Sequence, residues 1–63
     1  MRITLKAARI NAGLKQEDTA KALNVSKKTV ASWEKGKTMP AVDKIESLCA
    51  LYGVGYDNIR WIN

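Results

Sequence analysis

The 63-residue chain has no histidine, and it has only one cysteine and one proline. The absence of histidine removes the most common general base and the most common zinc ligand. The single cysteine, Cys49, permits neither a disulfide within the chain nor a cysteine-based metal site. No pair of carboxylates stands in a plausible cleft. We therefore expect the protein to have no enzymatic activity and to bind no metal and no cofactor. Cys49 is spaced among apolar residues as on a helix, which favours a buried core residue over a reactive thiol.

Long hydrophobic runs are also missing from the sequence. No apolar stretch approaches the roughly 20 residues that cross a membrane, and the N-terminus MRITLKAARI is too polar for a signal peptide. With 46% hydrophobic residues and no low-complexity segment, the composition favours a folded chain over a disordered one. We therefore expect one domain over residues 1–63, in the cytoplasm, with no membrane partner and no evident small-molecule site.

Positive charge is abundant, and it lies in one half of the chain. Residues 1–37 hold nine Lys or Arg and three Asp or Glu, a net charge of +6, whereas residues 38–63 have a net charge of −1. A basic patch is the electrostatic footprint of a nucleic-acid partner. Ordinary solvated lysines are the alternative, so charge alone leaves both interpretations open.

Apolar spacing and helix-ending residues predict an all-α chain with five helices and no strand. The helices are expected at about residues 4–12, 16–23, 27–35, 42–52 and 56–61. Gly13, Gly36 and Gly53 follow the first, third and fourth helices, because glycine accepts the left-handed backbone of a helix end.

Three- and four-residue spacing also predicts which side chains point inward. In the first helix we expect Arg9 to face solvent and either Ile10 or Ala12 to enter the core. The last helix is expected to bury Ile59 and Ile62. The fourth helix is expected to bury one face, made up of Val42, Ile45, Leu48, Cys49 and Tyr52.

Residues 16–35 carry the clearest pattern in the chain. Ala20 is small enough for two helices to cross closely, and Asn24, four residues later, can adopt the left-handed backbone of a tight turn. Ser26 suits the N-cap of the next helix, in which Val30 faces inward. This order and spacing predict a helix-turn-helix. Its second helix opens with exposed lysines, and such a helix fits the major groove of DNA.

The same pattern extends over nearly the whole chain, in the segments LKAARINAGLKQ, ALNVSKKTVASWEKGKTMP and VDKIESLCALYGVGYDNI. In these segments the chain resembles the phage repressor and Cro family of helix-turn-helix proteins, the Xre-like bacterial regulators. The most specific pieces are Gly13-Leu14 followed by Gln16, Val25-Ser26, and the run from Trp33 to Lys37 followed by Pro40. The resemblance implies a compact five-helix domain, lambda-repressor-like, that binds DNA.

The chain departs from the family pattern at Lys15, Thr19 and Asn24. Lys15 lacks the side-chain acceptor of the usual Ser or Thr N-cap, a loss of at most about 1 kcal/mol. Thr19 replaces a larger aliphatic residue, which implies a thinner core. Asn24 replaces a frequent glycine, and none of the three departures removes the expectation of DNA binding.

The resemblance also implies which side chains touch double-stranded operator DNA. The family positions that reach base edges are occupied by Lys27, Lys28, Thr29 and Ser32. The positions that lie against the DNA backbone are occupied by Gln16, Ser26, Lys35, Lys37, Thr38 and Arg9. Lysine donates to guanine O6 and N7, so two adjacent lysines indicate guanines in the half-site, unless one of them contacts only phosphate. Arg9 and Glu34 match positions that form a partly exposed ion pair.

A repressor-type regulator of this kind is expected to bind as a homodimer, with half-sites about 34 Å apart. Possible dimer contacts are Tyr56, Trp61 and Ile62, because tryptophan is enriched at interface hot spots. The alternative for Trp61 is a terminal aromatic that folds back on its own domain. The rival function is an antitoxin or adaptor that binds a partner protein through the same apolar residues.

Overall fold

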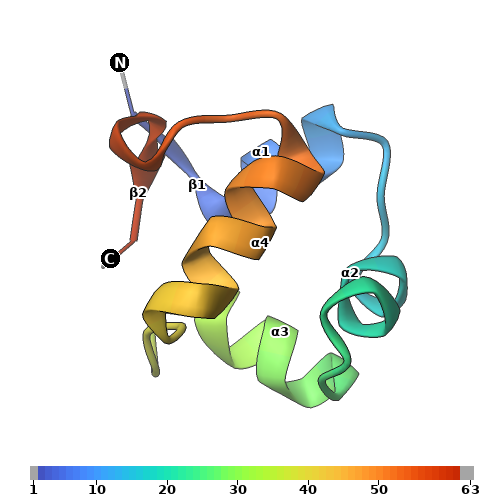
Figure 1. Ribbon diagram of the computed structural model, residues 1–63. Helices are drawn as coiled ribbons and strands as arrows, with labels where there is room; N and C mark the ends of the chain where they lie inside the picture. Colours follow the sequence, from blue (N-terminus) through green and yellow to red (C-terminus); the bar gives the residue numbers. More distant parts are fainter. Residues whose placement is uncertain (1, 62–63) are drawn as a thin grey trace.

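The computed structural model describes residues 2–61, in which the helices pack around one core (Figure 1). The elements, in chain order, are β1 (Ile3–Thr4), α1 (Leu5–Asn11), α2 (Gln16–Leu23), α3 (Lys27–Glu34), α4 (Val42–Tyr52), the 3-10 turn η1 (Tyr56–Asn58) and β2 (Ile59–Arg60). Both α2 and α4 begin and end where the sequence predicts, and α1 and α3 lie within their expected ranges. The predominantly helical class is therefore confirmed.

The expectation of a fifth helix and of no strand is wrong. The segment 56–61 forms η1 and β2 instead of a helix. β2 pairs in parallel with β1, so that Ile3 lies opposite Ile59 and Thr4 opposite Arg60. Figure 1 accordingly shows the first and last described segments side by side.

The local reason for this difference is a tight turn that precedes β2. The backbone N–H of Gly55 donates a hydrogen bond of 2.8 Å to Asn58 Oδ1, which closes a single turn. The segment has room for fewer than two helical turns, too few for a helix that is stable by itself. The extended backbone that follows lets Ile59 enter the core, where it is 2% exposed.

The core is one apolar cluster to which all four α-helices and β2 contribute. Its members are Leu5, Ala8, Ala20, Leu23, Val30, Trp33, Leu48, Tyr52 and Ile59. Because each helix supplies one stripe to the same cluster, the outward side of every helix is set by what it buries.

The inward face of α1 differs from the expected one. Arg9 is buried, while Ile10 is 55% exposed and Ala12 is exposed as well. The expected third inward residue of α1 is therefore wrong, because apolar patterning assigns charged residues to solvent. Arg9 lies inside because it has a buried acidic partner, which is described below.

The apolar stripe of α4 is narrower than expected. Ile45, Leu48 and Tyr52 are buried, whereas Val42 is 72% exposed and Cys49 is only half-buried. The two residues flank the stripe instead of belonging to it. The prediction that both lie in the core is therefore wrong, and they contribute to a surface described below.

One backbone conformation and two hydrogen bonds fix the turn that leads from α2 into α3. Asn24 has the left-handed backbone expected of it, with φ of 58°. The Lys44 ammonium donates to the carbonyl of Leu23 at 3.1 Å, which satisfies an acceptor at the end of α2. The Ser26 hydroxyl accepts from the backbone N–H of Thr29 at 3.1 Å and caps α3, as predicted.

Two of the family departures have partners in the structure. The Asp18 carboxylate accepts from the backbone N–H of Lys15 at 2.9 Å, so the start of α2 has a polar contact although the Lys15 side chain provides no acceptor. Thr19 is fully buried, and its hydroxyl lies 2.8 Å from the Tyr52 hydroxyl. The smaller side chain thus supports a buried hydrogen bond between α2 and α4.

Candidate nucleic-acid interface

The helix pair α2 and α3 forms the end of the domain away from the two strands (Figure 1). α3 buries Val30 and Trp33, which are 0% and 7% exposed. Lys27 and Lys28, in the first turn of α3, are exposed on the other side. The sequence therefore fixes the roll of the helix: packing of the inward pair turns the lysines outward.

Four lysines surround the outward side of α3: Lys27, Lys28, Lys35 and Lys37. All four are exposed, and within residues 2–61 no hydrogen bond or ion pair engages their ammonium groups. Their charges are therefore available to an anionic partner. Like charges gathered on one side repel one another unless such a partner or salt screens them.

The hydroxyl groups predicted to contact DNA are paired with one another. Ser26 Oγ lies 2.9 Å from Thr29 Oγ1, and Ser32 Oγ lies 3.1 Å from Thr38 Oγ1. The second pair ties α3 to the loop that follows it. This bond could not be predicted from the sequence, since a six-residue separation across a helix end belongs to no local pattern.

Behind α3, a buried ionic network joins three helices. The Arg9 guanidinium meets the Glu34 carboxylate with Nε to Oε2 at 2.7 Å, and their side chains are 10% and 4% exposed. Arg9 Nη1 donates to the carbonyl of Leu14 at 2.8 Å. The predicted ion pair is confirmed, but the expectation that it is partly exposed is wrong. The hydrogen bond to Glu34 raises the pKa of Arg9, against the opposing effect of burial.

The network extends to Gln16, the first residue of α2. Its side-chain amide donates to Glu34 Oε1 at 3.0 Å. This contact was not predicted from the sequence, from which we expected Gln16 to lie against the DNA backbone. It fixes the orientation of the amide beside the N-terminus of α2, where free backbone N–H groups favour phosphate. A phosphate contact by Arg9 stays a prediction, with its guanidinium already engaged by two acceptor residues.

The residues predicted to contact a second subunit lie at the opposite end of the domain. Trp61 stacks on Tyr56 with ring centroids 5.6 Å apart, and its indole N–H donates to the Tyr56 carbonyl at 3.1 Å. Trp61 is half-buried against the core, so it folds back on its own domain. Tyr56 is 54% exposed, and Ile62 lies outside the described residues.

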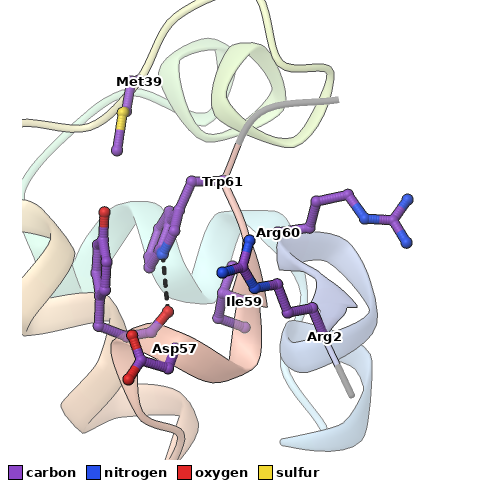
Figure 2. Close-up of a pocket in the computed structure, with 7 residues that line it drawn as sticks. Arg2, Met39, Asp57, Ile59, Arg60 and Trp61 are labelled. Atoms are coloured by element: carbon purple, nitrogen blue, oxygen red, sulfur yellow. Dashed lines mark hydrogen bonds between the residues drawn. The ribbon is translucent and has the colours of Figure 1, made fainter.

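Two hollows lie beside this aromatic pair and share Met39 and Tyr56. One has a volume of about 230 Å³ and is drawn in Figure 2, where Arg2 and Arg60 lie toward the side away from Met39. The other is an apolar groove of about 700 Å³ along α4. Its lining consists of Met39, Pro40, Ala41, Val42, Ile45, Glu46, Cys49 and Tyr56. This groove was not predicted from the sequence, because Val42 and Cys49 were expected in the core.

The comparisons with known proteins agree with this geometry. A family model described as helix-turn-helix matches residues 5–59. The cryptic phage CTXphi transcriptional repressor RstR of Vibrio cholerae is 34% identical over 50 residues, which cover 79% of this chain and 45% of that repressor. No solved structure matches the chain. Within residues 2–61, no helix has the length and apolar character that crossing a membrane requires.

A left-handed turn between two packed helices, with a basic outward side on the second, defines a helix-turn-helix protein. The chain belongs to that family, in its phage repressor and Cro-like group. The chain spans less than half the length of the curated repressor it matches.

Proposed function

We propose that this chain is the operator-binding domain of a repressor-type transcriptional regulator and that α3 enters the major groove. The observation that carries the proposal is the outward side of α3, where Lys27 and Lys28 are exposed and form no hydrogen bond or ion pair with any of residues 2–61. Ammonium groups at the start of a helix in the groove reach guanine O6 and N7. The proposal involves no catalytic step, and it implies action on the nucleoid in the cytoplasm.

Sequence readout and positioning fall to different residues in this proposal. Base edges are contacted by Lys27, Lys28, Thr29 and Ser32. The DNA backbone is contacted by Gln16, Ser26, Lys35, Lys37, Thr38 and Arg9. Phosphate contacts fix register and carry no direct sequence information. The Gln16–Glu34 hydrogen bond supports this division, because it holds a proposed phosphate contact rigidly relative to the readers on α3.

Selection of bound sites from random DNA tests the proposal directly. We expect a palindromic motif with guanines in each half-site and half-site centres about 34 Å apart. Binding that enriches no motif would contradict operator recognition. It would favour the rival function of an antitoxin or adaptor, for which the apolar groove along α4 is the supporting observation.

We further propose that a second copy of the chain occupies this groove. Val42, Tyr56 and Met39 are 72%, 54% and 45% exposed, and a contiguous exposed apolar surface of this kind marks a protein interaction site. Glu46 is the one charged residue in the lining of the groove. Trp61, although folded back, supports the surface by stacking against Tyr56.

Charge complementarity favours a second copy over another protein. The apolar groove has Glu46 in its lining, whereas the neighbouring hollow has two basic residues, Arg2 and Arg60, against one acidic residue, Asp57 (Figure 2). A two-fold axis that passes beside the shared residues Met39 and Tyr56 sets the acidic side of each copy against the basic side of the other. Such an isologous contact closes as a dimer.

Sedimentation with and without operator DNA tests the dimer. Val42→Glu should abolish association while leaving the unfolding midpoint unchanged, because the side chain is exposed in the single copy. Ala50→Glu adds the same charge at another exposed position of α4 and serves as the matched control. If Val42→Glu still dimerises, the interface lies elsewhere. A wild-type chain that is monomeric even on DNA would favour a partner protein in the groove.

A further inference from the structure

The outward side of α3 carries a small hollow that the proposed lysine contacts do not use. It has a volume of about 140 Å³ and is lined by Lys28, Ala31, Ser32, Lys35 and Lys37. Four of these residues follow one another along a single face of α3 and its end, and the fifth comes from the next loop. The hollow therefore lies within the surface that is proposed to contact DNA.

The walls of this hollow are mostly carbon. Ala31 and Ser32 are half-buried at its base. The Ser32 hydroxyl is bonded to Thr38 at 3.1 Å, so its polar atom already has a partner in the loop. Lysine side chains line hollows with their aliphatic stems and keep the ammonium group in solvent. What the hollow offers a ligand is an apolar base within a positively charged rim.

The chemistry of the major groove limits what can enter such a hollow. The lysine rim attracts a polyanion, and its charges can pair with flanking phosphates. Base edges in the major groove present hydrogen-bond donors and acceptors, with one apolar group among them, the C5-methyl of thymine. At the base of the hollow only the Ser32 hydroxyl could bond a donor or an acceptor, and it is already bonded to Thr38, whereas a methyl group requires no partner.

We propose that this hollow receives the C5-methyl group of one thymine in each half-site. The inference rests on the proposed operator binding and adds to it a base that is selected without a hydrogen bond. Ala31 and Ser32 are then specificity-determining residues through the surface they offer. Burying one methyl group is expected to favour thymine over uracil by about fourfold at that position.

The test replaces each thymine of the selected operator, one at a time, with deoxyuridine, which removes only the methyl group. We expect one position in each half-site at which wild-type binding weakens by about fourfold. Ala31→Leu fills the hollow, and should abolish the difference between thymine and uracil at that position only. Ala50→Leu makes the same change at an exposed position on α4 and should preserve the difference.

The measured quantity is the ratio of affinities for the two bases, which a uniform loss of binding or of folded protein leaves unchanged. The inference is overturned, with operator binding intact, if no thymine is methyl-sensitive or if the motif contains none. It is also overturned if the sensitivity persists in Ala31→Leu, because the methyl group is then read elsewhere. Failure to select any motif removes the proposed function itself.

Discussion

The two sides of α3 differ in almost every physical respect. On the inner side, Val30 and Trp33 are buried and the Glu34 carboxylate is held by Arg9 and Gln16. On the outer side, Lys27 and Lys28 are exposed and have no side-chain partner in the described part of the chain. Within residues 2–61, no buried side-chain polar atom lacks a hydrogen bond. The polar side chains of α3 that remain available to a ligand are therefore on its outer side.

This difference separates stability from recognition along a single helix. A domain of this size buries only about 60% of the surface that its unfolded chain exposes, so it has little stability to lose. The outer lysines repel one another in the free protein, and the inner contacts must offset that repulsion. Substitutions on the inner side should therefore act on unfolding, and substitutions on the outer side on DNA binding.

The largest expected effect comes from breaking the inner ion pair. Glu34→Ala leaves the Arg9 guanidinium buried without its partner, and should lower the free energy of unfolding by about 3–5 kcal/mol. Urea denaturation at neutral pH measures the loss. Glu17→Ala, at an exposed position of α2, is the matched control and should have little effect. A loss below about 1 kcal/mol for Glu34→Ala would mean that the pair is as weak as a surface pair.

A second change on the inner side sharpens the role of the Thr19–Tyr52 hydrogen bond. Tyr52→Phe leaves the buried Thr19 hydroxyl unpaired, and should cost about 1–3 kcal/mol. The double variant Thr19→Val with Tyr52→Phe removes both polar groups and should recover most of that loss. If the double variant recovers none of the loss, the phenol stabilises the fold through packing and not through this bond.

The same phenol makes stability depend on alkaline pH. Burial raises the pKa of Tyr52 above its ordinary value of 10.0. The folded chain therefore keeps this proton in a range where the unfolded chain has lost it, so stability falls as pH rises above about 10. Burial also raises the pKa of Cys49 above its ordinary value of 9.0, so this thiol likewise makes stability fall as pH rises. Tyr52→Phe should reduce the slope above pH 10 relative to wild type, as measured by denaturation at several pH values.

On the outer side, Lys28→Ala should leave the unfolding free energy unchanged. It should weaken operator binding by about 1–3 kcal/mol and relax specificity at one base position. Fluorescence anisotropy with operator and random DNA measures both effects. Lys6→Ala removes one exposed charge from α1 and controls for net charge. An equal loss on both DNAs would reject base readout by Lys28.

The smallest expected effect concerns Lys37, in the loop after α3. As a phosphate contact, Lys37→Ala should weaken binding to all sequences alike and should reduce the slope of log affinity against log salt by about 1. A titration at several salt concentrations measures this slope. An unchanged slope would exclude Lys37 from the phosphate contacts.

Structural features were predicted correctly where they depend on residues close together in the sequence, and were missed where they depend on distant ones. α2, the turn at Asn24 and the Ser26 cap were predicted correctly because each depends on residues within one or two turns. The burial of Arg9 was missed because its cause, Glu34, lies 25 residues away. β2 was missed for the same reason, since its partner β1 is at the other end of the chain.

The candidate site was predicted to a similar extent. The exposure of Lys27 and Lys28 followed from helical periodicity once Val30 was assigned to the core. The hydrogen bonds that Gln16 and Ser32 make within the protein did not follow, because each partner is set by tertiary packing. The apolar groove was missed because a valine or a cysteine at helical spacing looks the same whether it is buried or exposed.

The pairing of β1 with β2 has a consequence for the order of folding. It closes a loop of nearly the whole chain, and loops of that length form after local contacts such as those between α2 and α3. Ile59 completes the core only when this loop is closed. During synthesis, which proceeds from the N-terminus, the helix pair is therefore made early but remains without its full core until residue 59 has left the ribosome. The helix pair that we propose to meet DNA is therefore synthesised before Ile59, the residue that completes its core.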